Sequence, residues 1–451
     1  MEIKQFEDKN LAHYSYAIIS NGEIALVDPA RDPQPYYDYA TKHQAKITAI
    51  IETHPHADFV SSHLEISKHT GANIYVSKLV AAEYEHVSFD EGDALIIGSV
   101  TLKALNTPGH SPDSISALLL DENGKEIAVF SGDTLFIGDC GRPDLREQAG
   151  AITADRSELA KLMYHTLRNK FLPLADSVLV YPAHGAGSLC GKGLSDAASS
   201  TMGAEKISNW SLGNMSETDF INSLLQDQPY VPKYFPHDVS INKKGAANFA
   251  KSVQAVEIRE TITCEGCAKS LNPHYLVIDT RPEALFKASH LRNAINLMND
   301  TKFETWLGSI VDPNEKFYLQ AQNETELNIL LKRIAKIGYE NQVELAFISE
   351  FGNESSPKFP AEDFELSSEN YTIVDIRTSA ERAAKKIFSR SYHIPLAELR
   401  ERYPEIPTEK PIVVHCAGGY RSAAGASILA SKIGAKVPVY DFSERIKQFA
   451  L

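Results

Sequence analysis

Short apolar runs separated by polar loops are the first pattern in this chain of 451 residues. Between residues 18 and 180 these runs recur with Gly, Asp or Pro in the loops beside them, which predicts short strands. Polar side chains that could hold a ligand follow several runs, and a rigid sheet presents functional loops in this way. The predicted strands lie at residues 23–29, 47–51, 100–105, 127–130 and 178–181.

The C-terminal half contains an internal repeat. Residues 275–281 (YLVIDTR) recur as residues 371–377 (YTIVDIR), an offset of 96, and the tripeptide KIG at 336–338 recurs at 432–434 with the same offset. Two similar domains therefore follow one another. Each copy reads strand, helix, strand, helix, which predicts a parallel α/β sheet. Residues 351–360 have linker composition, and we place the earlier boundary at Asn242–Gly245. We therefore expect domains at 1–245, 246–352 and 353–451.

Composition limits the classes of function. The length suggests about three domains, and 43% hydrophobic and 23% charged residues are typical of a globular protein. A formal net charge of −14 argues against a nucleic-acid partner, since phosphates would be repelled. We see no signal peptide and no apolar run of membrane-spanning length. We therefore expect a cytoplasmic protein, with no membrane partner, whose five cysteines are free thiols.

The loop after the predicted strand at 47–51 is rich in metal-binding side chains. His54, His56 and Asp58 alternate in the run Thr-His-Pro-His-Ala-Asp-Phe. This run resembles the His-x-His-x-Asp-His signature of the metallo-β-lactamase superfamily. In members with two metals the sixth signature residue is a histidine, whereas here it is Phe59, which has no donor atom. The first inference is therefore a single metal.

Four further segments carry the same resemblance, in the superfamily's order. They are Leu26–Pro29, Thr107–Ser111, Ser131–Leu135 and Tyr181–Gly185. The resemblance covers about residues 1 to 245 and implies a four-layer αβ/βα sandwich with the site at one edge of the sheets. For the whole chain we expect a multidomain α/β and α+β protein, with this sandwich followed by two rhodanese-like parallel α/β domains.

The resemblance implies that His54, His110 and Asp133 are the metal ligands. Two imidazoles and one carboxylate suit non-haem Fe(II) and leave open positions for substrate and O₂. This is the ligand set of the persulfide dioxygenase branch. The residues expected to orient the ligands and bound water are His56, Asp58 and His184. Whether His56 contacts the metal stays open, and His13, His43, His63, His69, His86 and His165 belong to no pattern.

Residues 131–144 also resemble the persulfide dioxygenase branch, in which the arginine of a Gly-Arg-x-Asp segment faces the carrier of the substrate thiol. The resemblance therefore makes Arg142 the candidate for binding an anionic group of the substrate.

The glycine-rich loop at 184–192 places Cys190 close to the predicted metal site. Such a loop is typical of dioxygenases that are fused to rhodanese domains. The thiol could receive or relay sulfane sulfur, or it could be a small residue in a loop, and the sequence leaves both open. We expect Cys140 to pack rather than react. Cys264 and Cys267 have no second pair of ligands nearby, so a zinc or redox role is only weakly indicated.

Cys416 lies where an apolar strand meets a helix of small residues. The helix N-terminus stabilises a thiolate or persulfide anion, Gly418 and Gly419 let backbone N–H groups form an anion-binding nest, and Arg421 adds positive charge. The run from Cys416 to Arg421 resembles the rhodanese active loop, in the six-residue form of sulfurtransferases. The 96-residue offset puts Gln320 opposite Cys416. We therefore expect the first copy to be a catalytically silent spacer or docking domain.

The whole pattern predicts a persulfide dioxygenase fused to a silent and an active rhodanese domain, and it resembles the bacterial fusion enzymes of sulfide detoxification. The resemblance implies one Fe(II) per chain, O₂, and a persulfide of glutathione, coenzyme A or a similar thiol. It also implies sulfite and thiosulfate as products. We expect a homo-oligomer, either dimer or tetramer.

Two alternatives stay open. One is a thioester hydrolase of the glyoxalase II type, with a metal-activated hydroxide as nucleophile. The other is a sulfur-carrier or regulatory protein in which the metal domain is only structural.

Overall fold

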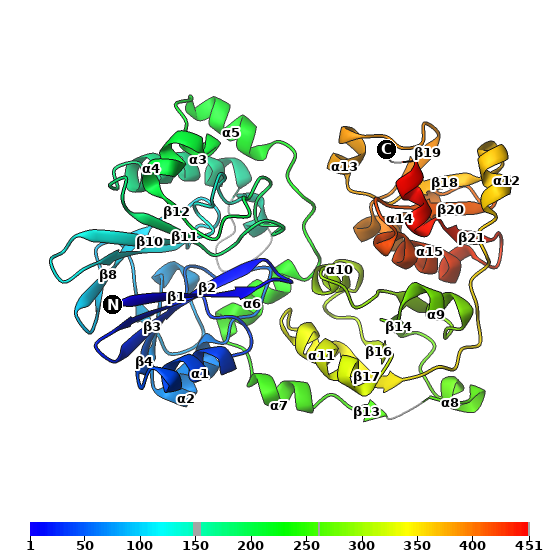
Figure 1. Ribbon diagram of the computed structural model, residues 1–451, viewed down its shortest axis with the longest axis horizontal. Helices are drawn as coiled ribbons and strands as arrows, with labels where there is room; N and C mark the ends of the chain where they lie inside the picture. The colour runs from blue at the N-terminus through cyan, green and yellow to red at the C-terminus, as the bar shows by residue number, and fades with distance from the viewer. Residues whose placement is uncertain (148–154, 260–261, 450–451) are drawn as a thin grey trace. The chain divides into compact units, whose positions relative to one another are not determined.

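The structure, a computed structural model, describes residues 1–147, 155–259 and 262–449. The chain divides into two compact units (Figure 1). Unit 1 is Met1–Ser252 with Ala335–Gly338, and unit 2 is Val253–Ile334 with Tyr339–Leu451. The domain boundaries that we place at residues 245 and 352 stay predictions.

Two six-stranded sheets form the middle of unit 1 (Figure 1). The first has the order β1-β2-β3-β4-β5-β6, and its strands are β1 (Glu2–Asp8), β2 (His13–Ser20), β3 (Glu23–Val27), β4 (Lys46–Ile51), β5 (Asn73–Val76) and β6 (Val87–Ser88). The second has the order β12-β11-β10-β9-β8-β7, and its strands are β7 (Ala94–Ile97), β8 (Val100–Asn106), β9 (Ile115–Leu120), β10 (Glu126–Gly132), β11 (Leu179–Pro182) and β12 (Ser200–Thr201). The strands predicted from the apolar runs are β3, β4, β8, β10 and β11.

Helices cover the outer face of each sheet in unit 1. The helices that pack on the first sheet are α1 (Gln34–Lys42) and α2 (His63–Thr70). Those that pack on the second are α3 (Arg156–Thr166), α4 (Met202–Ser208) and α5 (Glu217–Leu225). Two more helices follow, α6 (Phe235–Lys244) and α7 (Phe249–Gln254). A separate apolar cluster fills the space between the sheets. The predicted four-layer sandwich is confirmed.

Strand β9 shows how a strand between two covered layers is recognised by its residues. All six of its residues are buried. Ile115, Ala117 and Leu119 pack in the core between the sheets, whereas Leu118 and Leu120 pack against the helices on the outer side. Side chains alternate between the two faces of a strand. A strand covered on both faces is therefore apolar throughout, and it has no alternating pattern.

Unit 2 contains two sheets. The first has the order β13-β17-β16-β14-β15 and the second the order β19-β18-β20-β21, and neighbouring strands are parallel in both. The strands are β13 (Ile258–Arg259), β14 (Leu276–Asp279), β15 (Ala294–Asn296), β16 (Phe317–Ala321), β17 (Val343–Ile348), β18 (Thr372–Asp375), β19 (Ser391–His393), β20 (Ile412–His415) and β21 (Val439–Asp441). The predicted parallel α/β arrangement of both repeats is confirmed.

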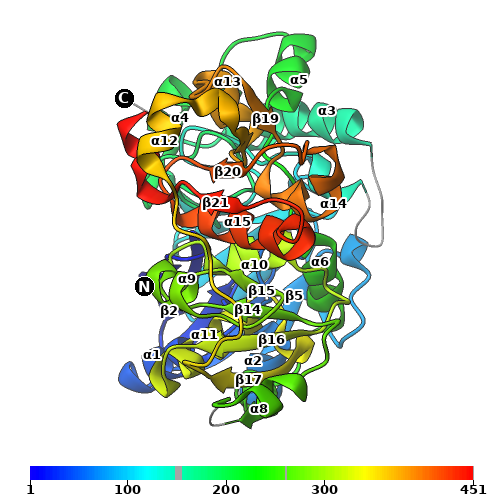
Figure 2. The same cartoon turned by 90° about the vertical axis from the view of Figure 1, so that its right-hand side faces the viewer.

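Helix α15 joins the two sheets of unit 2. The helices of this unit are α8 (Glu265–Lys269), α9 (Glu283–Ala288), α10 (Phe303–Ile310), α11 (Glu324–Ala335), α12 (Ala361–Leu366), α13 (Ser379–Ala384), α14 (Leu399–Arg402) and α15 (Tyr420–Ile433). Helix α15 contacts β20 and β21 of the second repeat and β15 of the first (Figure 2). Two hydrogen bonds connect α15 to the first repeat: Asn296 N donates to Ser427 Oγ at 3.0 Å, and Tyr420 Oη donates to Met298 O at 3.1 Å.

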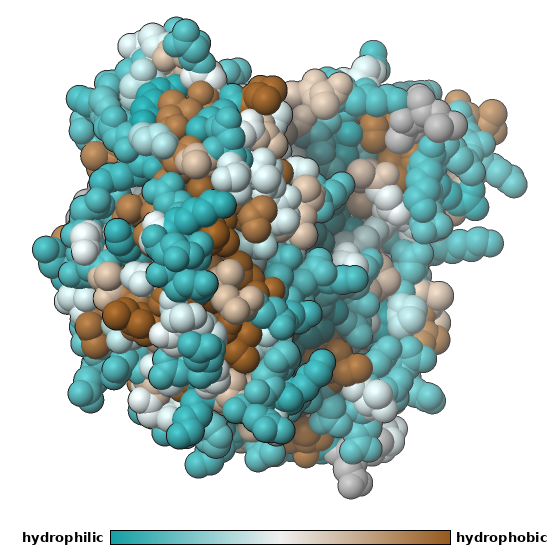
Figure 3. All heavy atoms as spheres, turned by 60° about the vertical axis from the view of Figure 1, so that its left-hand side comes forward, coloured by the Kyte–Doolittle hydropathy of each residue, from teal (hydrophilic) through white to brown (hydrophobic). Residues whose placement is uncertain are grey.

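Hydrophilic residues make up much of the molecular face in Figure 3, with apolar residues between them. Ile96, Ile207 and Leu366 are among the exposed large apolar side chains, and they lie on separate elements. Within the described parts of the chain, every helix is too short or too polar to cross a bilayer.

We expect Leu119→Ala to destabilise unit 1 by about 2–5 kcal/mol, because it removes buried methyl groups and leaves a cavity between the sheets. Urea denaturation of the full chain, followed by circular dichroism, measures the loss. Ile96→Ala is the control, since Ile96 is 70% exposed on β7 and its truncation should change stability little. Equal effects of the two substitutions would contradict the assignment of the core.

Candidate active sites

Four strand ends bring the predicted metal ligands together. The loop after β4 carries His54, the loop after β8 carries His110, and the residue directly after β10 is Asp133. His184 follows β11, the parallel neighbour of β10. Gly132 makes the turn into Asp133 possible, because its φ is +54° and a Cβ there would lie 2.6 Å from Thr53 Oγ1.

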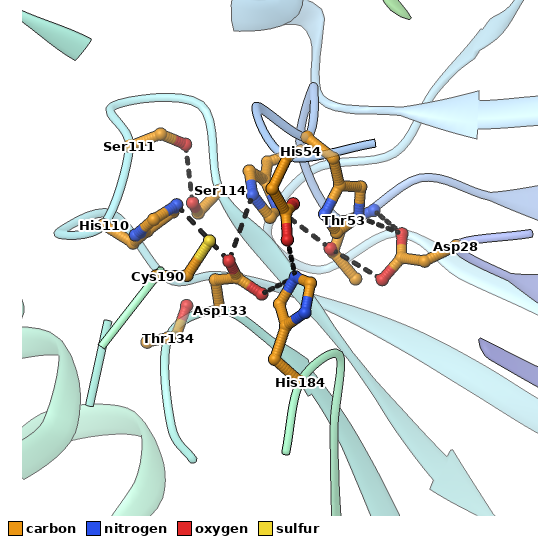
Figure 4. Close-up of polar contacts among 12 residues, drawn as sticks. Asp28, Thr53, His54, His110, Ser111, Ser114, Asp133, Thr134, His184 and Cys190 are labelled. Atoms are coloured by element: carbon orange, nitrogen blue, oxygen red, sulfur yellow. Dashed lines mark hydrogen bonds and ion pairs between the residues drawn. The ribbon is translucent and has the colours of Figure 1, made fainter. Parts of the chain in front are cut away.

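Asp133 lies at the centre of this group (Figure 4). Its Oδ2 is 3.8 Å from His54 Nε2 and 3.5 Å from His110 Nε2. Its Oδ1 is 3.5 Å from His184 Nε2, which in turn is 3.4 Å from Asp58 Oδ2. The carboxylate thus faces imidazoles on both sides, and all of these side chains are buried.

The three predicted ligands fit a metal ion. Their donor atoms lie within 4.8 Å of one another. His54 Nε2 and both carboxylate oxygens of Asp133 are buried and, within the part of the chain described, have no hydrogen-bond partner. Burial, with His56 and His110 nearby, holds the pKa of His54 well below its ordinary value, and burial also lowers the pKa of His110. Neutral imidazoles beside a carboxylate are ready to accept a cation.

His184 differs from the two histidines that are predicted to be ligands. Burial disfavours its charged form, but the carboxylates of Asp133 and Asp58 outweigh burial and raise the pKa of His184 to about 9. Its Nδ1 lies 3.2 Å from the carbonyl oxygen of Ala12. The charged form of this imidazole is therefore favoured, with both carboxylates at ion-pair distance from its Nε2.

Phe59 lies among the histidine rings. Its ring centroid is 4.4 Å from that of His56 and 3.8 Å from that of His13. His56 Nε2 is 3.3 Å from Asp28 Oδ1, and His56 is also close enough to Asp133 and His184 to share a metal with them. His56 is therefore within reach both of Asp28 and of a cation held by Asp133 and His184.

His13 belongs to no sequence pattern, yet its ring lies beside those of His56 and His184. It is buried at the start of β2 and forms an isolated β-bridge with His184. The buried ion pair between Arg146 and Asp113, with Nη2 to Oδ2 at 2.7 Å, is likewise not indicated by any motif. This pair fixes the loop after His110, because Ser111 Oγ also donates to Asp113 at 2.6 Å. The serines around Asp113 are the only sequence signal for such a network.

Arg142 is buried, and its donors are already used. Nε and Nη2 donate to the two carboxylate oxygens of Asp144 at 2.7 and 2.6 Å, while Nη2 and Nη1 also donate to the carbonyl oxygens of Pro229 and Leu189. The Arg142 backbone N–H donates to the carbonyl oxygen of Cys190 at 2.9 Å. A substrate anion would have to displace Asp144. In this structure Arg142 clamps the loop that carries Cys190.

Cys190 lies beside Asp133 and His184, close to the predicted metal ligands, as the glycine-rich loop indicates (Figure 4). It is buried, and its sulfur is close enough to Asp58 and His184 to share a metal with them. Burial and the charges of Asp58 and Asp133 raise the pKa of the Cys190 thiol well above its ordinary value. Without a cation nearby, Cys190 is therefore a neutral thiol. Cys140 is buried in the apolar cluster under the helices, which agrees with the expected packing role.

The loop after β20 forms a cradle around Cys416. Gly419 N–H donates to Cys416 Sγ at 3.1 Å, and Ser422 Oγ donates to the carbonyl oxygen of Gly419 at 2.8 Å. Gly419 has φ +108°, and a Cβ there would meet Glu444 N at 3.0 Å, so the loop requires glycine. The 14-residue helix α15 begins at Tyr420, so its positive end stabilises an anion on the sulfur.

Arg421 has a carboxylate partner. Its two Nη atoms donate to the two oxygens of Glu381, both at 2.6 Å. Burial alone would raise the pKa of Glu381, but the hydrogen bonds and charge of Arg421 outweigh it and lower that pKa. The guanidinium carbon of Arg421 also lies 5.7 Å from the ring centroid of Trp306 in the first repeat. Both repeats therefore hold the arginine of the loop.

Sheet register refines the comparison of the two repeats. Asp279 pairs with Gln320, whereas the equivalent Asp375 pairs with His415. The first repeat is therefore one residue longer between these strands, and Ala321, not Gln320, lies opposite Cys416. Neither Gln320 nor Ala321 has a thiol. Both repeats keep the Asp–Arg pair that we expect to serve the fold, with Arg281 and Arg377 each donating to the aspartate two residues earlier.

Two family models match this chain. The metallo-beta-lactamase superfamily matches residues 9–184, and the rhodanese-like domain matches residues 362–444. The second match covers only the second repeat, so the rhodanese assignment of the first repeat stays a prediction.

Curated relatives of the N-terminal part have two different activities. The chain is 37% identical over 134 residues to the cytoplasmic hydroxyacylglutathione hydrolase of Arabidopsis thaliana, and the match covers 29% of this chain and 52% of that protein. It is 29% identical over 164 residues to the mitochondrial persulfide dioxygenase ETHE1 of Homo sapiens, with 36% and 59% covered. The chain thus spans little more than half the length of these relatives, and they do not decide between hydrolase and dioxygenase.

A solved structure covers more of the chain. It is the crystal structure of a metallo-beta-lactamase from Staphylococcus aureus subsp. aureus COL, with 30% sequence identity and a TM-score of 0.67. The similarity covers 77% of this chain and 99% of that one. On this similarity, together with the strand-end ligands and the Cys416 loop, the chain belongs to the metallo-β-lactamase superfamily and carries a rhodanese-like domain near its C-terminus.

Proposed function

We propose that this protein is a persulfide dioxygenase with an attached sulfurtransferase. A low-molecular-weight persulfide, dioxygen and water give the free thiol and sulfite in the N-terminal site, and Cys416 transfers sulfane sulfur in the C-terminal site. The observation that carries the proposal is the buried set of His54, His110 and Asp133, with Phe59 where a further histidine would serve a second metal.

The proposed cofactor is one iron(II) ion per chain, held by His54, His110 and Asp133. A facial set of two imidazoles and one carboxylate, when it holds iron(II), supplies open positions for O₂ chemistry. Supporting this choice, His54 Nε2 and both oxygens of Asp133 are buried and have no hydrogen-bond partner among the described residues. Burial also lowers the pKa of both imidazoles, which favours their neutral form.

Other residues of the site act on these ligands. His184, whose charged form is favoured, lies at ion-pair distance from Asp133 and Asp58 and stabilises both carboxylates in their ionised form. Arg142 holds the backbone at Leu189 and Cys190, which keeps the thiol of Cys190 at the site. Cys190 is a candidate for receiving sulfane sulfur. Direct binding of a substrate anion by Arg142 stays a prediction that requires Asp144 to move.

The chemistry at Cys416 follows from its loop. The Cys416 thiolate attacks the terminal sulfur of a persulfide, the donor S–S bond breaks, and the donor thiol leaves with a proton. The Gly419 N–H and the N-terminus of α15 stabilise the resulting cysteine persulfide anion. Sulfite then attacks the outer sulfur, which releases thiosulfate and restores the thiolate.

The reactions proposed for the two sites are linked by sulfite. The first site makes sulfite and the second consumes it, so both reactive sulfane sulfur and sulfite would be removed. Glutathione or coenzyme A persulfide is the proposed class of substrate.

The second candidate is a thioester hydrolase, because the hydrolase from Arabidopsis thaliana is a relative at 37% identity. Phe59 weighs against a two-metal centre, and a fused rhodanese has no use in thioester hydrolysis. The third candidate is a sulfur carrier in which the metal is only structural. Sulfur transfer that continues after the metal is lost would favour this carrier over both enzymes.

Metal analysis of the purified chain distinguishes these candidates. We expect one iron per chain, and Asp133→Asn should lose most of it, because an amide replaces the only carboxylate ligand. Inductively coupled plasma mass spectrometry measures the content. Two zinc ions per chain would favour the hydrolase instead.

We expect His110→Ala to abolish O₂ uptake with glutathione persulfide, since the ligand set loses an imidazole. An oxygen electrode measures the rate. His165→Ala is the matched control, because His165 lies on α3 with a half-exposed side chain paired to Glu217 and should leave uptake unchanged. Undiminished uptake in His110→Ala would remove His110 from the proposed centre.

We expect Cys416→Ser to keep O₂ uptake but to change the main product from thiosulfate to sulfite. Chromatographic separation of the sulfur oxyanions measures the ratio. Gln322→Ala, in the exposed loop of the first repeat, is the control and should leave the ratio as it is. An unchanged ratio in Cys416→Ser would refute the coupling.

A further inference from the structure

Cys264 and Cys267 are separate from both candidate active sites. Three of the five cysteines, Cys140, Cys190 and Cys416, are buried, whereas Cys264 is exposed and Cys267 is intermediate. All five are free thiols. A thiol must be accessible before it can exchange with a small sulfur compound in solution. On this ground Cys264 is the best placed of the five to react first.

The two thiols are neighbours. Cys264 is the N-cap of α8, and Cys267 N–H donates to its Sγ at 3.1 Å. Both thiols therefore belong to one turn of the chain, so a disulfide between them requires only a local adjustment to a Cβ–Cβ separation of about 3.5–4.5 Å. The hydrogen bond from the Cys267 thiol, followed by the backbone N–H groups, lowers the pKa of Cys264.

The two cysteines are not equivalent. Cys267 is partly buried and packs with Ala268, Leu271 and Tyr275 against the apolar cluster of the first repeat. Cys264 projects into solvent. An exposed attacking thiol beside a shielded second thiol is the arrangement that allows a mixed disulfide to form and then to be resolved within the chain.

A metal site is not supported at this pair. Among the described residues, each group of three or more side chains that could hold a metal ion lies in unit 1, and none includes Cys264 or Cys267. Zinc in a structural site takes four ligands. The remaining chemistry of a Cys-x-x-Cys pair in a chain with parallel α/β repeats is thiol–disulfide exchange.

We propose that Cys264 and Cys267 form a redox-active dithiol that reduces the S–S bond of low-molecular-weight disulfides and persulfides and becomes an intramolecular disulfide. Cys264 thiolate attacks one sulfur of R–S–S–R′, the S–S bond breaks, and R′S⁻ leaves and takes a proton. Cys267 then loses its proton and attacks the Cys264 sulfur, which releases RS⁻. The dithiol is oxidised by two electrons, and the substrate is reduced to two thiols or, for a persulfide, to a thiol and hydrogen sulfide.

This activity is independent of the metal centre and of Cys416. The test uses the full chain without O₂, incubated with an excess of oxidised glutathione and then alkylated. Peptide mapping is expected to find a Cys264–Cys267 disulfide, with two glutathione molecules released per chain. Cys267→Ser is expected to stop at a glutathione mixed disulfide on Cys264 and to release half as much thiol. Cys264→Ser is expected to show neither product in this peptide.

The second arm replaces oxidised glutathione with glutathione persulfide, again without O₂. Hydrogen sulfide should be released in step with disulfide formation, and Cys264→Ser should lose that part of the release. Disulfide formation in the first arm without sulfide in the second would restrict the substrate to disulfides. Thiols that stay reduced in both arms, a zinc ion bound by the pair, or the same product with Cys264→Ser would each overturn the proposal. Failure of O₂ uptake would bear only on the dioxygenase.

Discussion

The buried carboxylate of Asp133 is the constraint on which the N-terminal site depends. A charge removed from water costs several kcal/mol unless partners compensate for it, and the oxygens of Asp133 have no hydrogen-bond partner among the described residues. The chain supplies three imidazoles within 4 Å instead. Two of them are held neutral and one is held protonated, which leaves one side of the carboxylate open for a cation.

Much of the fold and part of the site follow from the sequence, because the signals are local. Asp133 stands directly after a strand, and His54, His110 and His184 lie in the loops that follow three others, so a correct set of strands already brings them to one edge. His13 could not be found in this way, since it starts a strand about 170 residues from His184, its partner in the bridge. The contacts of Arg142 could not be predicted either. Its acceptors at Pro229 and Leu189 are backbone carbonyls of distant loops, which any residue type could provide.

The repeat shows a different limit of the sequence. A constant offset between the copies is a fair guide at Asp279 and Asp375, but one additional residue before β16 moves the equivalent of Cys416 from Gln320 to Ala321. The residue types in a loop do not indicate how the neighbouring strands pair, so the register is known only from the structure. The absence of a nucleophile in the first repeat does not depend on this correction, since neither residue has a thiol.

Helix α15 limits how the chain can be divided. Its small residues let it pack closely on the sheet of the second repeat, where a Cβ at Gly425 would come within 2.7 Å of Ile376 Cδ1. The same helix accepts a hydrogen bond from Asn296 and gives one to Met298. A fragment that starts at residue 353 would expose this part of α15 to water and would tend to self-associate. Recombinant work on the rhodanese-like domain should therefore keep both repeats together.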